Sequence, residues 1–481
     1  MKILLINPPC RLPTFIPLGI GYIASILRQD GHEVSLLDIN AHPCKEREVE
    51  DFLRQADFEI AGIGGLSSVY KYVKWLANTL KAAKPQAPVV AGNMVATASP
   101  GTLLAHSGVD AAVIDEGELT FRELVSVYRR GGDLGAVKGI CFKQGGQIRE
   151  NQPRERISDL DALPYPAWDI FDMEAYLRSG ADSLVSYGLR ALNISSVRGC
   201  PYECTFCSHP FGRQVYARSA RSIAGEMAEL AKRYGVGFIK FTDDLFLVNE
   251  NRVMELCDRI LLGKIKIKWS AAARVNLVNR RLLKAMRRAG CAELGYGFES
   301  GSQRILDGMK KRVTVAQAQE AIRLTREAGI RVSGSFIIGM PEETERTIDE
   351  TVEFAKRTGL PIHRFFYATP YPRTQLYDTA KAMGRIPDDE DRYLESLGEM
   401  RLCPPVNLTD FSDAELVRLK TAAEARAKKN LPVREKWNDC REDWLRRLGC
   451  ARMSISNGGV FNFAGSVSRR AWHKLAGRRA N

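Results

Sequence analysis

The chain has 481 residues, 45% of them hydrophobic and 21 of them proline, a composition that fits a globular protein and excludes a disordered, collagen-like or coiled-coil chain. At about 100–200 residues per domain, this length predicts two to four domains. Nine of the thirteen net positive charges lie in 412–481, which argues against nucleic acid as the partner and favours contact of a basic C-terminus with a membrane surface or an acidic partner.

Five short apolar segments alternate with amphipathic stretches between residues 2 and 114, and each is expected to be a strand. Strands at this spacing need crossover helices, so they predict a parallel sheet with helices on both faces, a doubly wound domain over 1–150. In such a sheet, ligands bind at the loops that follow the carboxyl ends of the strands. The expected strands are KILLIN (2–7), EVSLLD (33–38), EIAGIG (59–64), PVVAG (88–92) and DAAVI (110–114).

A polar, proline-containing stretch then breaks the periodicity and predicts a linker over 151–185. From 186 to 380, six further strand-like segments alternate with helical ones. They predict a partial (β/α)6 barrel of TIM type, with its functional groups at the carboxyl ends of the strands. The remaining residues, 381–481, are expected to form a small, basic, mainly helical domain.

The strongest chemical signal is a group of three cysteines, Cys200, Cys204 and Cys207, in RGCPYECTFCSHP directly after the first barrel strand. The N-terminus has the pattern of a strand and turn rather than of a signal peptide. No apolar run approaches the roughly 18–20 residues that span a bilayer. The cysteines are therefore expected in a reducing cytoplasm, where clustered thiolates bind metal.

Two kinds of metal centre are compatible with this spacing. A structural zinc needs four closed ligands, and His209 is a candidate for the fourth. A [4Fe–4S] cluster held by three cysteines instead leaves one iron open to chelate a small molecule. An open iron is a catalytic device, so the two alternatives predict different classes of protein.

The C-x-x-x-C-x-x-C spacing in this loop resembles the radical S-adenosylmethionine (SAM) superfamily. The first part of the chain, at 17–40 and 109–124, is similar to the cobalamin-binding domain that precedes such barrels. Glu342 and Arg373 stand where the family often has glycine. The resemblance extends along the barrel to FTDDLF (241–246), AAARVN (271–276), GYGFESGSQRIL (295–306), SFIIGMPEET (335–344) and YATPYPRTQLY (367–377).

The resemblance implies that the three cysteines hold a [4Fe–4S] cluster and that SAM binds beside it. Phe206, the aromatic residue before the last cysteine, would lie beside the adenine. Glu299 and Ser300, at the end of the fourth barrel strand, would approach the ribose or the methionine moiety.

Three further residues at strand ends are candidates for SAM binding, each with a structural alternative. Asp243 and Asp244 would orient SAM or the substrate, or one of them would cap the next helix. Arg274 would pair with a carboxylate of the ligand, or it would form an ordinary salt bridge in the barrel.

For cobalamin, the resemblance points to the loops after the third, fourth and fifth strands of the first domain. Ser68 is equally suited to be a helix N-cap. The D-x-H-x-x-G signature that supplies a histidine to cobalt is absent, because Asp38 is followed by Ile39 and Asn40 and His42 falls two places too far along. Cobalamin is therefore expected to bind without a histidine on cobalt. The candidate residues are Ser67, Ser68, Gly92, Asn93, Gly117 and Glu118.

The resemblance as a whole implies an enzyme that reductively cleaves SAM to a 5′-deoxyadenosyl radical for cobalamin-dependent methylation of an unactivated carbon. An anaerobic oxidative cyclase using the same cofactors is the nearest alternative. A more distant alternative is a non-catalytic cobalamin- or nucleic-acid-binding module with a zinc-stabilised barrel. The expected partners are a small-molecule or lipid-like substrate and an electron donor such as flavodoxin or ferredoxin.

Overall fold

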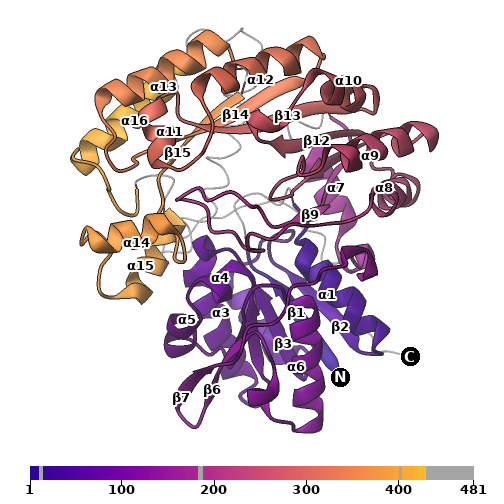
Figure 1. The fold of residues 1–481 in the computed structure, drawn as a ribbon. Coiled ribbons are helices and arrows are strands. Elements are labelled where there is room, and N and C mark those ends of the chain that lie inside the picture. Colours follow the sequence, from indigo (N-terminus) through magenta and orange to yellow (C-terminus); the bar gives the residue numbers. More distant parts are fainter. Residues whose placement is uncertain (10–14, 182–187, 361, 400–403, 429–481) are drawn as a thin grey trace.

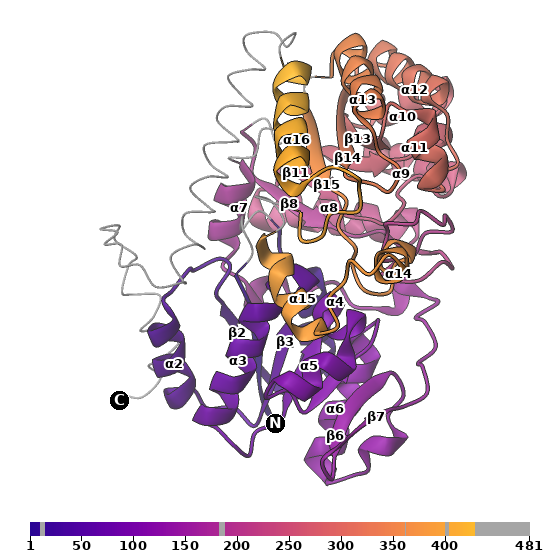
Figure 2. The same cartoon turned by 90° about the vertical axis from the view of Figure 1, so that its left-hand side faces the viewer.

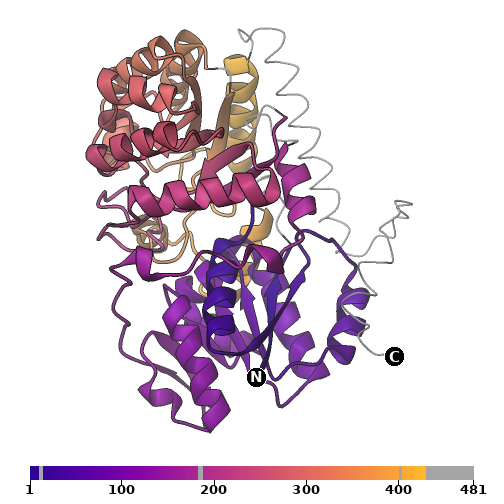
Figure 3. The ribbon, with the colours of Figure 1, turned by 90° about the vertical axis from the view of Figure 1, so that its right-hand side faces the viewer.

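The structure, a computed structural model, describes residues 1–9, 15–181, 188–360, 362–399 and 404–428. Two α/β units are stacked, and the helices that follow them in the chain lie alongside both (Figures 1 and 3). None of the described helices is long and apolar enough to cross a membrane. The basic stretch 429–481, for which a membrane or acidic-partner contact is expected, lies outside the described residues.

The first unit is built on a seven-stranded sheet in the order β2-β1-β3-β4-β5-β6-β7. Its first five strands are parallel, as predicted, whereas β6 and β7 add an antiparallel hairpin that the sequence analysis missed. All four residues of β7 are exposed, so this strand lacks the alternation that reveals a half-buried strand. The strands are β1 (Lys2–Asn7), β2 (Glu33–Asp38), β3 (Ile60–Gly64), β4 (Val89–Gly92), β5 (Ala111–Val113), β6 (Ile140–Gln144) and β7 (Gln147–Glu150).

Helices cover both faces of this sheet, so the predicted doubly wound fold is confirmed. Along β1, Ile3 and Leu5 belong to the core on one face, and Leu4 and Ile6 to the core on the other, because successive side chains of a strand point to opposite faces. One face is covered by α1 (Leu18–Gln29) and α6 (Glu118–Arg130). The other is covered by α2 (Glu46–Gln55), α3 (Tyr70–Ala83), α4 (Asn93–Ala98) and α5 (Pro100–His106).

The second unit is a six-stranded parallel sheet in the order β15-β14-β13-β12-β11-β8, which confirms the predicted partial barrel. Its outer face packs against helices through side chains such as Ile239, Phe241 and Trp269. The strands are β8 (Ala191–Ile194), β11 (Phe238–Phe241), β12 (Lys268–Ala273), β13 (Cys291–Glu299), β14 (Arg331–Ile338) and β15 (Ile362–Tyr367). The helices are α8 (Ala220–Tyr234), α9 (Glu250–Leu262), α10 (Arg280–Arg288), α11 (Gln303–Gly308), α12 (Val315–Glu327) and α13 (Glu345–Thr358).

The described helices outside the two sheets connect the units. In the linker region, α7 (Met173–Ala181) brings the Tyr176 hydroxyl to 2.8 Å from Asp38 at the end of β2. After α14 (Gln375–Ala382), α15 (Glu390–Ser396) contacts α3 through a bond of 2.6 Å from the Tyr70 hydroxyl to Asp391. Helix α16 (Asp413–Lys428) instead runs beside α13 (Figure 2). The C-terminal helices therefore pack on both units.

Candidate functional site

The carboxyl edges of the two sheets face one another. Glu118, five residues after β5 of the first sheet, pairs at 2.5 Å with Arg198, four residues after β8 of the second. Arg373, beyond the end of β15, donates a hydrogen bond of 3.1 Å to the carbonyl of Thr97 in the first unit. Because ligands of parallel sheets bind at these edges, the contact region is the place where a functional site is expected.

The three cysteines lie on a loop that a small hairpin closes. Strand β9 (Val197–Arg198) pairs antiparallel with β10 (Tyr216–Ala217), so residues 199–215, here called the cluster loop, begin and end at one place. Within it, the amide of Cys200 donates to the carbonyl of Gly212 at 3.1 Å. Gly199 has a φ of +87°, and a Cβ there would lie 2.0 Å from the carbonyl oxygen of Gln214, so only glycine fits where the loop begins.

The thiols fit an iron–sulfur cluster better than a single zinc ion. Cys204 is buried, Cys200 and Cys207 are half-buried, and all three are free. Burial raises the pKa of Cys200 and of Cys207, and the charge of neighbouring thiols adds to this effect. Among the described residues, no three Cys, His, Asp or Glu side chains are placed to hold one metal ion.

His209 is turned away from the role of a fourth zinc ligand. Its Nδ1 lies 2.9 Å from the carbonyl oxygen of Cys207 and its Nε2 lies 2.6 Å from that of Tyr202, so both ring nitrogens face the backbone of the loop. Three thiols without this histidine match the donor set of a cluster with one open iron.

A buried cation, Arg274, lies beside the cysteines. The guanidinium of Arg274 stands 3.5 Å from the ring centre of Tyr202, and its Nη1 lies 3.6 Å from the sulfur of Cys204. It also donates to the carbonyl of Lys311. No carboxylate is among the contacts described for Arg274, so the salt-bridge alternative is wrong. Arg274 therefore places a positive charge against the cluster loop.

The sequence analysis missed Lys311, which connects two of the predicted SAM-binding residues. Its ammonium lies 2.9 Å from a carboxylate oxygen of Glu299 and 5.7 Å from the ring centre of Phe206. Glu299 is buried and has a φ of +65°. Nothing in the sequence marks Lys311, because it follows α11 in a run of ordinary surface-type residues, GMKKR. The structure thus gathers Arg274, Glu299 and Lys311 next to Phe206 and the cysteines of the cluster loop.

Asp243 and Asp244 hold the backbone that leads into the cluster loop. Asp243 accepts bonds from the amide of Val197 at 3.0 Å and from the amide and hydroxyl of Ser196, and Asp244 accepts from the amide of Gly199 at 2.9 Å. The helix-cap alternative is wrong for both, since Asn249 caps α9. Their contact with SAM stays a prediction.

Ser300 is buried, and its hydroxyl bonds at 3.0 Å with the hydroxyl of Thr351 and with the amide of Ser302. It therefore ties the end of β13 to α13. Its predicted approach to SAM is not tested by these contacts.

The predicted cobalamin residues all lie at the carboxyl edge of the first sheet. Ser67 is buried and opens a short 3-10 helix, Ser67–Val69. Ser68 is not a helix cap, because Val69 precedes the first residue of α3 and Leu66 precedes the 3-10 helix. Gly92 ends β4, and Asn93 begins α4 with a φ of +63°.

On the same edge, Gly117 precedes α6, and Glu118 is buried with its carboxylate on Arg198. The imidazole of His42 lies 3.0 Å from Asp172 in the linker region. The binding of cobalamin by these residues stays a prediction.

The two positions where the family often has glycine keep a conformation that glycine favours. Glu342 has a φ of +64° and Arg373 a φ of +66°, in the left-handed region that is costly for other residues. Each side chain has a partner, since Glu342 pairs with Arg304 at 3.1 Å and Arg373 reaches the first unit. Both loops therefore have a backbone conformation that glycine adopts at the least cost.

Glu343, in the loop after β14, gives a testable pH effect. It is buried, and its carboxylate accepts a bond of 2.7 Å from the amide of Gly339, yet burial raises its pKa from 4.5 to about 7. Between pH 4.5 and about pH 7, Glu343 is ionised in the unfolded chain but still protonated in the folded protein. The free energy of unfolding therefore falls as the pH rises through this range, by about 3 kcal/mol in all. In Glu343→Gln this loss should be absent. Urea unfolding at pH 5, 6, 7 and 8 checks the difference, and parallel curves for the two proteins would contradict it.

Comparison with known proteins agrees with this arrangement. The B12 binding domain matches residues 10–125, and the Radical SAM superfamily matches residues 194–355. The uncharacterized methyltransferase PH0819 of Pyrococcus horikoshii is 34% identical over 392 residues, which are 79% of this chain and 83% of that protein. The anaerobic magnesium-protoporphyrin IX monomethyl ester cyclase of Cereibacter sphaeroides is 29% identical over 75% of this chain and 60% of its own length.

Among solved structures, the cobalamin-dependent S-adenosylmethionine radical enzyme OxsB, with aqua-cobalamin and S-adenosylmethionine bound, has a similar fold. The TM-score is 0.72 at 19% sequence identity, over 93% of this chain and 71% of that chain. The two family matches follow the order predicted from the sequence, and the Pyrococcus relative spans both of them. The chain therefore belongs to the radical SAM superfamily, in the branch with a B12 binding domain, and is an enzyme whose cofactors are a [4Fe–4S] cluster, SAM and cobalamin.

Proposed function

We propose that this enzyme is a cobalamin-dependent radical SAM C-methyltransferase. The observation that carries the proposal is the placement of the cluster loop against the carboxyl edge of the first sheet, through the buried pair of Arg198 and Glu118. This placement supports a single reaction space between the two cofactors. The methyltransferase relative that is 34% identical along both chains supports the same reaction type.

The chain's own residues would position the reactants. Cys200, Cys204 and Cys207 would hold the cluster, with Arg274 countering the charge at Cys204. Phe206 would offer its ring to the adenine, and the loops after β3, β4 and β5 would receive cobalamin. Bound there, the cluster would supply the electron that cleaves SAM, and cobalamin would supply the methyl group.

The inner face of the barrel supports a small-molecule or lipid-like substrate. Ala272 is exposed although β11 and β13 flank its strand, so side chains do not fill the space above it. Phe366 in β15 is 46% exposed, while its neighbours Phe365 and Tyr367 are buried in the outer core. An apolar part of the substrate would contact Phe366. The reducing electrons would come from a flavodoxin- or ferredoxin-like donor in the cytoplasm.

The proposal is tested with the reconstituted holoenzyme, a reductant, an extract of the source organism and SAM carrying a carbon-13 methyl group. We expect the label in a new product, together with both 5′-deoxyadenosine and S-adenosylhomocysteine. Label that stays in methionine while 5′-deoxyadenosine accumulates would contradict methylation.

That second outcome would favour oxidative cyclisation, the other candidate function. It is supported by the 29% identity with the Cereibacter cyclase, of which this chain spans 60%. The labelled extract separates the two candidates because a cyclase consumes SAM without moving its methyl group to the product.

A further inference from the structure

Loop 115–118 of the first unit is acidic, and three arginines from three other segments converge on it. Its sequence is Asp-Glu-Gly-Glu, directly after β5 and its following residue Ile114. The arginines come from the linker (Arg156), from β9 directly before the cluster loop (Arg198) and from the loop after β15 (Arg373). Three carboxylates thus face three guanidinium groups where the two units meet.

The central contact is buried on both sides. Arg198 places its Nη1 2.6 Å from Glu116 and its Nη2 2.5 Å from Glu118, and all three side chains are at most 7% exposed. Burial alone would lower the pKa of Arg198, but Glu118 and Glu116 outweigh it and raise that pKa. The guanidinium also lies 5.0 Å from the ring centre of Phe211 within the cluster loop. The guanidinium of Arg198 is therefore held in one position relative to the two glutamates, because any displacement would leave a buried charge unpaired.

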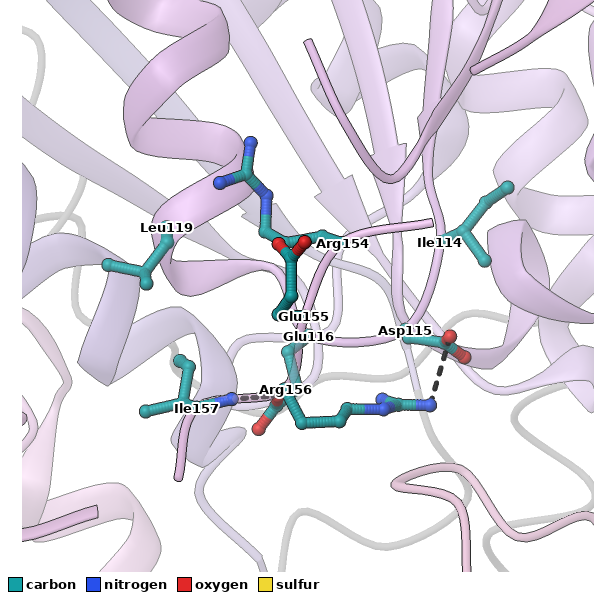
Figure 4. Close-up of a pocket in the computed structure, with 8 residues that line it drawn as sticks. All are labelled: Ile114, Asp115, Glu116, Leu119, Arg154, Glu155, Arg156 and Ile157. Atoms are coloured by element: carbon teal, nitrogen blue, oxygen red, sulfur yellow. Dashed lines mark hydrogen bonds and ion pairs between the residues drawn. The ribbon is translucent and has the colours of Figure 1, made fainter. Parts of the chain in front are cut away.

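The outer contact is made by Asp115 (Figure 4). Its carboxylate lies 2.9 Å from Arg156 and 3.6 Å from Arg373, and its amide donates to the hydroxyl of Thr97 at 2.9 Å. Figure 4 shows Arg156 reaching Asp115, with the amide of Ile157 bonded to Glu116.

Each arginine is also close to the cluster loop, either in sequence or in space. Arg198 stands two residues before Cys200. Arg156 lies against Gly212, since a Cβ at Gly212 would be 3.5 Å from its Nη2. Arg373 leads into α14, where the amide of Leu376 donates to the carbonyl of Thr205 at 2.8 Å.

Backbone strain occurs on both sides of the outer contact. Asp115 and Arg373 each have a φ of +66°, a conformation costly for residues with a Cβ. Conformations of this kind persist where surrounding contacts fix them, and here both side chains meet across the interface. Glycine at either place would relieve the backbone but would remove the charge.

We propose that loop 115–118 is the positioning element for the cluster: through Arg156, Arg198 and Arg373 it fixes the cluster loop relative to the cobalamin-type domain. The inference rests on the proposed function, because it assumes that both cofactors act in one space. The residues of the loop are positioning residues, since they act through the arginines and not on the reacting atoms.

The test compares hydrogen–deuterium exchange of peptides covering 199–213 in the reconstituted holoenzyme. In Glu116→Gln/Glu118→Gln, Arg198 stays buried without a carboxylate, so we expect exchange to rise about tenfold or more. Arg373→Gly tests the outer contact. The Arg373 side chain is half-exposed and glycine relieves the backbone strain, so this variant should keep its fold, and we expect the exchange of 199–213 to rise about twofold. The matched control is Asp30→Asn, which breaks the ion pair of Asp30 with Arg122 on the same helix α6 but keeps Glu116 and Glu118, and exchange of 199–213 should then stay unchanged.

A second readout follows the distance between the cofactors. In the wild type, the reduced cluster should enhance the electron-spin relaxation of bound cob(II)alamin, and the enhancement should fall and become heterogeneous in the double glutamine variant at equal cobalamin and iron content. Unchanged exchange and unchanged relaxation in both variants would overturn the positioning role. Neither measurement needs the substrate, so a failed methylation assay with these shifts present would count against the proposed function alone.

Discussion

Replacing Cys204 by alanine is expected to reduce SAM cleavage by at least about 10³-fold, equivalent to about 4 kcal/mol of barrier. Cys204 is the buried member of the three cysteines and the one that Arg274 contacts, so its loss would remove a proposed iron ligand and leave that cation without its sulfur partner. Anaerobic reconstitution followed by iron analysis and assay of 5′-deoxyadenosine measures both consequences.

The matched control is Cys44→Ala. Cys44 is also a free, half-buried cysteine, and burial raises the pKa of its thiol to about 11, but it lies between β2 and α2, away from the cluster loop. This variant should bind about as much iron as the wild type and cleave SAM at a similar rate. Full iron content in Cys204→Ala, or equal losses in both variants, would contradict the assignment of the cluster to this loop.

Replacing Arg218 by methionine is expected to lower the free energy of unfolding by about 3–5 kcal/mol. Arg218 follows β10, where the cluster loop closes, and it pairs at 2.5 Å with Glu226, which is 1% exposed. Burial raises the pKa of Glu226 and Arg218 opposes that rise, so removing the arginine leaves a carboxylate that resists ionisation. The unfolded chain ionises normally, and the loss of stability should therefore grow as the pH rises.

Urea unfolding at pH 5 and pH 8 measures this effect. The control is Arg233→Met, on the helix α8 that also carries Glu226. The exposed pair of Arg233 with Glu229 at 3.8 Å should contribute under about 1 kcal/mol to the free energy of unfolding. A loss in Arg218→Met no larger than that of the control would show that the buried pair is not a source of stability.

The architecture could be predicted because it depends on patterns that extend over many residues. Parallel strands buried on both faces have continuous apolar runs such as KILLIN and PVVAG, and their spacing leaves room only for crossover helices. The cysteine loop was equally visible, because its three ligands are close in sequence. The hairpin β6–β7 escaped prediction because its outer strand is exposed and carries no apolar alternation.

The detailed site could not be predicted to the same extent, because its contacts join residues far apart in the chain. Lys311 reaches Glu299 and Phe206, and Arg198 reaches Glu116 and Glu118, although no spacing rule connects these positions. The helix-cap alternatives failed for a related reason. An aspartate side chain can cap a helix or accept hydrogen bonds from the backbone of a distant loop equally well. Only the fold determines that Asp243 accepts bonds from the amides of Ser196 and Val197.

The space above Ala272 on the inner face of the barrel, which side chains do not fill, has an evolutionary consequence. On its outer face, β12 is fixed by Trp269 among the helices, so change there would disturb the core. On the inner face, Ala272 pairs in register with Gly295, and a Cβ at Gly295 would lie only 3.3 Å from the hydroxyl oxygen of Ser333, which is a tight contact. A larger side chain at Ala272 would therefore narrow the space available to a substrate while the outer core stays unchanged. A side chain at Gly295 would do the same once the Ser333 hydroxyl moved aside, so substitutions on this face are a physical route by which one fold acquires different substrates.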